Sequence, residues 1–191
     1  MNSKDSLIEL LSSLKEVNEI NLSEIPYIDL YMDQVTTLFN DKLKSLKRND
    51  NDVVLTKTMI NNYAKSRILP PIKNKKYSKM QIILLILIYN LKQILSLDDI
   101  KLLFTPLLEK LAQEKDGLIL DDLYDQFIND KIEQQNSIID QLIETVRAND
   151  NFNNDDIKFS LLTEVLLLVN AANIQKRAAE KIIDTYFKTD K

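Results

Sequence analysis

Apolar residues recur along this chain at the three- to four-residue spacing of α-helices, and no stretch alternates cleanly with a period of two. The first periodic segment follows Pro26 and predicts a helix over residues 30–46. Its expected apolar face consists of Val35, Leu38, Phe39, Leu43 and Leu46. A polar loop over residues 48–52 follows. The pattern therefore predicts an all-α fold.

A short helix and a pair of prolines come next. Thr56 is expected to cap a helix that reaches about Arg67, because a hydroxyl there accepts a hydrogen bond from an unpaired backbone N–H. Pro70 and Pro71 end this helix, since a residue before proline avoids the helical region. A basic connector over residues 72–77 leads onward.

The centre of the chain is its most apolar part. Ser78 and Gln81 have the spacing of a capping box, which predicts a helix start. The following residues 82–94 are apolar on nearly every side, so we expect them to form the buried central helix.

A second capping box, Ser96 and Asp99, predicts a helix through about Phe104, with a kink or a new start at Pro106. Residues 116–117, Asp-Gly, are expected to turn.

Two long helices are predicted for the remainder. The first runs from about residue 121 to 148, and the second runs from Asp155, expected as its cap, to about residue 187, with an interruption near residues 170–173. Residues expected to face inward on the first are Leu123, Phe127, Ile128, Ile132, Ile139, Leu142, Ile143 and Val146.

Composition removes several classes of function. The 191 residues include one Gly, no Cys and no His. One glycine cannot build a dinucleotide or phosphate loop, and without Cys or His there is no nucleophile–His pair and no zinc or thiolate site. We therefore expect no enzyme, cofactor or metal.

Targeting signals are not expected either. The N-terminus mixes charges unlike a signal peptide, and the most apolar run, residues 82–89, is shorter than the roughly 20 residues of a membrane span. These features predict a cytoplasmic protein.

Charge is unevenly distributed along the chain. Residues 42–79 carry eleven basic and two acidic side chains, within a chain whose net charge is −4. No acidic residue occurs between Thr56 and Ser78. Such a basic block is typical of a phosphate-binding face, although a solvated lysine-rich surface is the alternative.

Three acidic pairs could hold a metal ion or act as acid and base: residues 98–99, 121–122 and 155–156. Each pair lies where a helix is expected to begin, and carboxylates there complement the helix dipole. We interpret all three as capping residues.

The segment 55–103 carries the strongest functional signal. Its short helix is expected to place polar residues on one face, opposite Ile60, Tyr63 and Ala64. Asparagine can bond adenine through two hydrogen bonds, while lysine reaches guanine or phosphate. The candidate DNA contacts are Lys57, Thr58, Asn61, Asn62, Lys65 and Arg67 on this helix, and Lys73, Lys75, Lys76 and Lys79 after it.

The phrases MINNYAKSRILPP, KKYSKMQIILL and SLDDIKLLF resemble the winged helix-turn-helix of MerR-like regulators. In that family a recognition helix ends in a leucine-proline step, and a basic wing and a helix pair follow. This chain has Asn61 and Arg67 where those regulators usually have Arg and Gly. Residues 25–185 also resemble the bacterial family domain of unknown function 1836, most specifically over 55–104. The resemblance implies DNA binding.

We therefore expect a helical extension over residues 1–24, a MerR-like helix-turn-helix module over 25–108, and a helical dimerisation or effector region over 109–191. The expected function is sequence-specific binding of double-stranded DNA by a homodimeric bacterial transcriptional regulator, with no membrane contact. The alternative is a helical protein–protein interaction module that keeps the fold without specific DNA binding.

Overall fold

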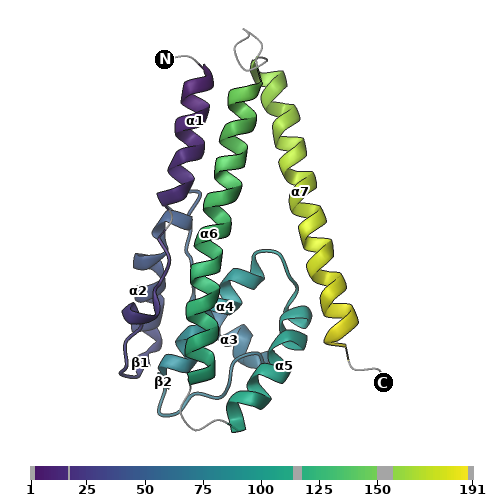
Figure 1. Ribbon diagram of the computed structural model, residues 1–191. Coiled ribbons are helices and arrows are strands. Elements are labelled where there is room, and N and C mark those ends of the chain that lie inside the picture. The colour runs from purple at the N-terminus through teal and green to yellow at the C-terminus, as the bar shows by residue number, and fades with distance from the viewer. Residues whose placement is uncertain (1–2, 17, 114–117, 150–156, 189–191) are drawn as a thin grey trace. The chain divides into compact units, whose positions relative to one another are not determined.

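The structure of the chain is a computed structural model that describes residues 3–16, 18–113, 118–149 and 157–188. Figure 1 shows a chain made almost entirely of helices, which confirms the expected all-α fold. The chain divides into two compact units. One comprises Asn18–Phe127 and Ala178–Lys191, and the other comprises Met1–Val17 and Ile128–Arg177. The expected turn at residues 116–117 and the expected cap at Asp155 lie outside the described residues.

The Asn18–Phe127 unit begins with the 3-10 helix η2 (Leu22–Glu24) and a short strand, β1 (Leu30–Tyr31). This strand pairs antiparallel with β2 (Lys76–Tyr77), so that Leu30 lies opposite Tyr77. The single helix expected over residues 30–46 is therefore wrong at its start, because backbone pairing with β2 holds Leu30 and Tyr31 extended.

The helix α2 (Met32–Lys42) follows β1 directly, and the 3-10 helix η3 (Lys44–Leu46) follows α2. The expected apolar face is largely confirmed, since Val35, Phe39 and Leu43 are buried. Leu46 is exposed instead, because the helix ends before it.

Next come α3 (Lys57–Lys65), β2 and α4 (Lys79–Lys92). Residues 81–88 of α4 are buried without interruption, which confirms the first part of the buried helix expected over residues 82–94. The helix ends at Lys92, and Ile94 beyond it is exposed. The capping box at its start is confirmed: the Ser78 N–H donates to Gln81 Oε1 at 2.9 Å. Helix α4 packs against α5 and β2, while α2 packs against α3 and both strands.

The helix α5 (Leu97–Gln113) starts at the second capping box, where Ser96 Oγ and Asp99 Oδ2 are 2.6 Å apart. It continues through Pro106, so the expected end near Phe104 is wrong. Residues 105 and 106 are both exposed.

The helix α6 (Leu118–Ala148) contributes its first ten residues to the Asn18–Phe127 unit and the rest to the other unit. Leu120 and Tyr124 are buried in the first part, and Ile128, Ile139, Ile143 and Val146 are buried in the second. Leu123 and Ile132, expected to face inward, are 45% and 40% exposed. The sequence pattern missed Tyr124.

In the second unit, α1 (Ser3–Ser13) and the 3-10 helix η1 (Leu14–Glu16) lie antiparallel along α6. Lys4 Nζ donates to the Arg147 carbonyl at 2.6 Å near one end. Lys15 pairs with Asp140 at 2.5 Å near the other.

The helix α7 (Ile157–Tyr186) runs without the break expected near residues 170–173. By length and composition alone it could cross a membrane: its most apolar window has a mean hydropathy of 1.5, and no residue of that window is buried. Such a helix is weak evidence for a membrane protein. The run at residues 82–89 is shorter and lies in the core.

Candidate nucleic-acid interface

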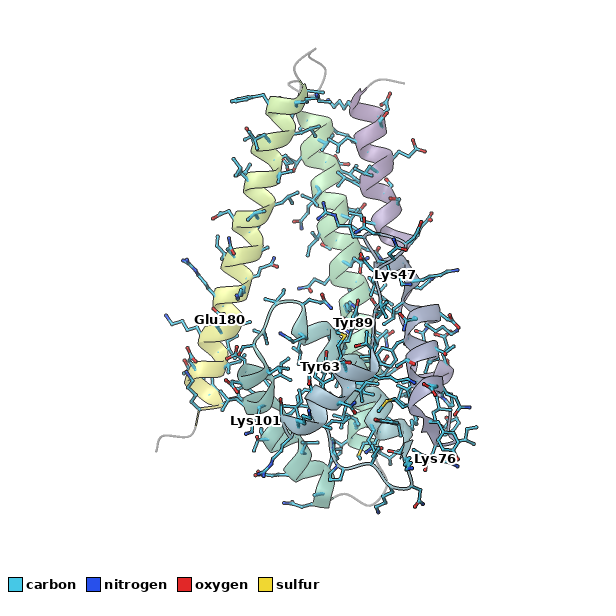
Figure 2. The ribbon with its side chains drawn as sticks, turned by 180° about the vertical axis from the view of Figure 1, so that it is seen from behind. Lys47, Tyr63, Lys76, Tyr89, Lys101 and Glu180 are labelled. Atoms are coloured by element: carbon cyan, nitrogen blue, oxygen red, sulfur yellow. The ribbon has the colours of Figure 1, made fainter. Side chains whose placement is uncertain are left out.

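The helix α3 and the two residues after it carry the first six candidate DNA contacts. Thr56 caps it as expected, because Thr56 Oγ1 accepts the Met59 N–H at 3.1 Å. Ile60 and Tyr63 anchor it in the core, and Tyr63 lies near Tyr89 of α4 (Figure 2). Burial raises the pKa of the Tyr63 hydroxyl, and Tyr89 adds to this effect. Helix α3 is thus held from one side only.

The outer face of α3 is open to solvent. Its exposed candidates are Lys57, Thr58, Asn61, Asn62, Lys65 and Arg67. Ala64 is also exposed, which is contrary to its expected place beside Ile60 and Tyr63. Among these candidates Lys57 alone has a described ion pair, with Asp33 of α2, and both side chains remain largely exposed. A surface pair of this kind exchanges readily for a phosphate contact.

The C-terminus of α3 is closed by a Schellman motif. The Arg67 N–H donates to the Ala64 carbonyl at 3.1 Å, and the Ile68 N–H donates to the Tyr63 carbonyl at 3.2 Å. Arg67 has φ of 60°, the left-handed conformation that glycine favours at this position. Arginine therefore closes this helix in a conformation that glycine would adopt more easily, at a cost in backbone strain.

The four basic candidates that follow α3 lie on or beside a tight turn. The Lys76 N–H donates to the Lys73 carbonyl at 2.9 Å, while Asn74 and Lys75 have φ of 52° and 60°. Two successive positive φ values indicate a type I′ turn, which joins antiparallel strands. Lys73 and Lys75 are therefore exposed at the tip of a small hairpin.

Lys76 and Lys79 lie closer to the body of the unit. The Lys76 ammonium lies 5.0 Å from the centre of the Tyr31 ring. Lys79 lies 4.8 Å from the Tyr27 ring and pairs with Asp121 of α6 at 2.6 Å, with its side chain only 17% exposed. A phosphate could reach Lys79 only by displacing Asp121.

Asn40 fixes the segment that connects α2 to α3. Its amide donates to the Thr36 carbonyl at 2.7 Å and to the Leu55 carbonyl at 3.1 Å, and its oxygen accepts the Val54 N–H at 2.9 Å. The connection includes η3 and is longer than the three or four residues of a simple helix-turn-helix. Asn40 therefore ties the start of α3 to α2 across this longer link.

The acidic pairs make no metal centre among the described residues. Asp98 and Asp99 lie in the first turn of α5, where Asp99 Oδ2 accepts the Ser96 N–H at 3.1 Å. Asp121 lies in the first turn of α6 and pairs with Lys79, so the expected place at a helix start is confirmed for these three carboxylates. The pair at residues 155–156 lies outside the described part of the chain.

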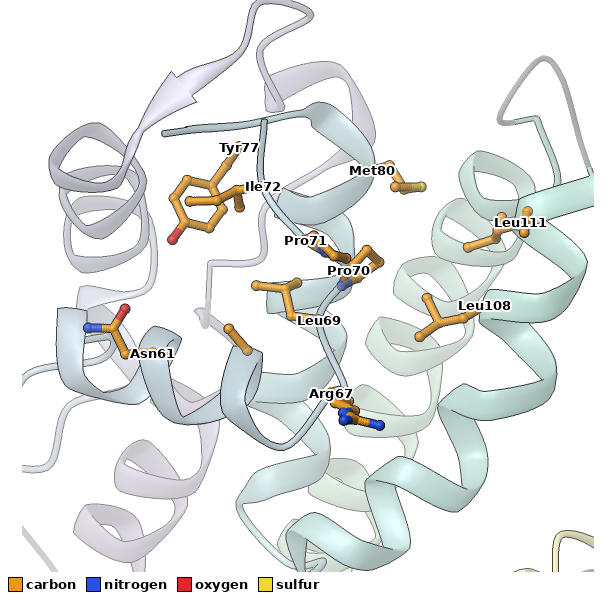
Figure 3. Close-up of a pocket in the computed structure, with 12 residues that line it drawn as sticks. Asn61, Arg67, Leu69, Pro70, Pro71, Ile72, Tyr77, Met80, Leu108 and Leu111 are labelled. Atoms are coloured by element: carbon orange, nitrogen blue, oxygen red, sulfur yellow. The ribbon is translucent and has the colours of Figure 1, made fainter. Parts of the chain in front are cut away.

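A cavity that the sequence analysis did not predict opens next to α3 (Figure 3). It has a volume of about 830 Å³. Its lining joins Asn61 and Arg67 to apolar residues of the proline segment, α4 and α5. Because residues far apart in sequence form it, no local pattern could have indicated it.

The fold and this surface define an all-α protein with a basic hairpin beside a short, polar-faced helix. The model of the family described as Domain of unknown function (DUF1836) matches residues 20–127, and the chain belongs to this family. The match ends short of residue 185, where the expected resemblance ended. Searches of curated proteins and of solved structures found no match.

Proposed function

We propose that this protein is a cytoplasmic, non-enzymatic bacterial transcriptional regulator that binds double-stranded DNA with sequence preference. In this proposal α2 and α3 act as a MerR-like helix-turn-helix, α3 enters the major groove, and the hairpin at residues 73–76 acts as the wing. The observation that carries the proposal is the open polar face of α3 beside a lysine-tipped hairpin, within a stretch free of acidic residues from 56 to 78.

The exposed side chains of α3 and those of the hairpin have different roles in this proposal, because they lie on different elements. Asn61 and Asn62 project from the exposed face of α3 and supply the donor–acceptor pairs that read base edges. Lys73 and Lys75 at the hairpin tip supply charge for the phosphate backbone. Lys79, held by Asp121, contributes least.

The test is a salt titration of binding on duplexes selected from a random pool and on scrambled duplexes. Asn61→Ala is expected to cost about 1–3 kcal/mol on the selected duplex and to relax its base preference. Lys75→Ala is expected to weaken both duplexes alike and to reduce the salt slope by about one unit.

The matched control is Lys101→Ala. Lys101 is an exposed lysine of α5, and Figure 2 shows it on the opposite side of the same unit from Lys76. The Lys101→Ala substitution should leave both the DNA affinity and the salt slope unchanged. Equal affinity for selected and scrambled duplexes at every salt concentration rejects specific regulation. No binding at low salt rejects a DNA role and favours the interaction module, whose basic face would bind an acidic protein.

We further propose that the protein is a homodimer joined through α7. Ten large apolar side chains of this helix are exposed to solvent: Phe159, Leu162, Val165, Leu166, Leu167, Leu168, Val169, Ile174, Ile182 and Tyr186. A helix of 30 residues is about 45 Å long, enough to supply the roughly 800 Å² per partner that a stable interface buries. A dimer with two α3 helices about 34 Å apart would match adjacent half-sites on DNA.

A further inference from the structure

The cavity beside α3 is built from several segments of the Asn18–Phe127 unit. Asn61, Ala64 and Arg67 come from α3 and its exit, and Leu108 and Leu111 come from α5. Figure 3 shows Asn61 at one end, the two leucines at the other, and Leu69 and Pro70 between them. The volume of about 830 Å³ lies within the range of small-molecule sites, roughly 300–1,000 Å³.

Hydrogen bonds hold the floor and one edge of this cavity in place. The buried Gln81 amide donates to the carbonyls of Pro70 and Pro71, both at 3.1 Å. The Schellman motif fixes the backbone of Arg67 at the edge. The cavity is thus formed before any ligand arrives, and little ordering cost opposes binding.

The lining combines apolar surface with a single cation. Met80 and Ile72 are 36% and 38% exposed, so water covers apolar side chains that a ligand could cover instead. Arg67 is exposed and has no ion-pair partner in the described part of the chain. A guanidinium binds carboxylate or sulfonate oxygens through two parallel hydrogen bonds.

We propose that this cavity binds a small amphipathic organic anion. Its apolar body lies against Met80, Leu108 and Leu111, and its acidic group binds Arg67, with the Asn61 amide as a second polar contact. A DNA phosphate could reach Arg67, but the charged sugar-phosphate backbone has no continuous apolar body to cover the two leucines. The lining therefore fits an organic acid better than it fits DNA alone.

Such a ligand would also regulate DNA binding, a consequence that rests on the proposed function. Asn61 and Arg67 belong both to the cavity and to the proposed DNA contacts. An anion bound there occupies these side chains and places negative charge beside the phosphates. It should lower DNA affinity, and DNA should lower the affinity for the anion by the same factor.

The experiment titrates the full chain with two probes of similar shape, anionic 8-anilinonaphthalene-1-sulfonate and neutral N-phenyl-1-naphthylamine, and follows methyl resonances by NMR. We expect saturable shifts of the Ala64, Met80 and Leu108 methyl groups at one equivalent of sulfonate probe. Arg67→Gly should weaken the sulfonate probe about tenfold and change the neutral probe less than about twofold.

Two variants complete the design. Ala64→Leu places a larger apolar side chain in the cavity from an exposed helical position and should weaken the binding of both probes there. Lys65→Ala removes a neighbouring α3 cation outside the cavity and should leave both affinities unchanged. Shifts confined to α7 methyl groups such as those of Leu166, or an unchanged sulfonate affinity in Arg67→Gly, would overturn the proposal.

A measurement of DNA binding in the presence of the probe distinguishes failure of the ligand site from failure of the proposed function. Saturating sulfonate probe should lower duplex affinity for the wild type but not for Ala64→Leu. If the probe binds the cavity and the duplex affinity does not change, the ligand site is supported, whereas the proposed coupling between ligand binding and DNA binding is wrong. If no duplex binds at all, the proposed function fails while the probe titration still decides the site.

Discussion

Two buried tyrosines show how the environment of one hydroxyl decides its effect on stability. The Tyr124 hydroxyl donates to the Ile20 carbonyl, whereas the buried Tyr63 hydroxyl has no hydrogen-bond partner in the described structure. Burial raises the pKa of both phenols, and Glu19 and Glu24 add to the rise for Tyr124. Each side chain is packed in the core.

These two residues make a paired prediction. Tyr124→Phe should lower the free energy of unfolding by about 1–2 kcal/mol, because it leaves the buried Ile20 carbonyl without its donor. Tyr63→Phe should be neutral or stabilise by up to about 1 kcal/mol, because it removes an unpaired polar atom from the core. Urea unfolding of both variants measures the difference, and equal losses would contradict this account.

Arg67 stores backbone strain at the exit of α3. Arg67→Gly should raise the free energy of unfolding by about 1 kcal/mol, since glycine adopts positive φ without a Cβ clash. Lys65→Gly, two residues earlier in the last helical position, should instead lower it by up to about 1 kcal/mol. The urea midpoints of the two variants should therefore move in opposite directions, and a loss in both would argue against the strain.

At the scale of elements, one ion pair joins the start of the Asn18–Phe127 unit to α2. Lys42 Nζ, in the last turn of α2, lies 2.6 Å from Glu24 Oε1 in η2. The hydrogen bond from Lys42 lowers the pKa of Glu24, and the Asn21 backbone N–H, 2.9 Å from Oε2, lowers it further. The pair therefore stabilises the fold only while Glu24 is ionised.

The stabilisation from this ion pair should decrease as the pH falls, because the pKa of Glu24 is lowered in the folded protein. A carboxyl with a lowered folded-state pKa stabilises the protein above its ordinary value of 4.5, and this contribution is lost as pH falls through the folded value. Glu24→Gln should cost less than about 1 kcal/mol at pH 7, because both side chains are partly exposed. This loss of unfolding free energy should disappear once the pH is low enough to protonate Glu24 in the folded protein. Unfolding measured across pH tests this, with exposed Glu9→Gln of α1 as the control.

At the scale of the whole molecule, the exposed apolar surface of α7 predicts association. We expect light scattering at tens of micromolar to report a dimer for the full chain. Leu166→Glu should convert it to a monomer, because a carboxylate in an apolar interface loses its hydration. Gln141→Glu, at an exposed polar position of α6 outside the proposed dimer helix, should leave the dimer intact.

A monomer with and without DNA would reject the dimer. Flotation of the wild type, but not of Leu166→Glu, with phosphatidylcholine vesicles would show instead that a membrane covers this helix. These outcomes distinguish a second copy of the chain from a lipid surface.

Local chemistry alone predicted much of the fold. Thr56, Ser78 and Ser96 each cap a helix as expected, because a cap needs only a hydroxyl and a backbone N–H three residues away. The same holds for the exposed polar face of α3, which follows from helical periodicity. The DNA contacts assigned to that face stay predictions.

Contacts between distant residues decided the rest. Pairing with β2, not any local preference, holds Leu30 and Tyr31 extended where a helix was expected. The Asp121–Lys79 pair and the cavity between α3 and α5 join residues more than forty positions apart, and no local spacing encodes such a meeting. Local spacing was thus enough to predict most helices and their caps, because a cap and an apolar face depend on residues a few positions apart. The covered faces, the ion pair that holds Lys79 and the cavity beside α3 depend on contacts between distant segments, which local spacing does not encode.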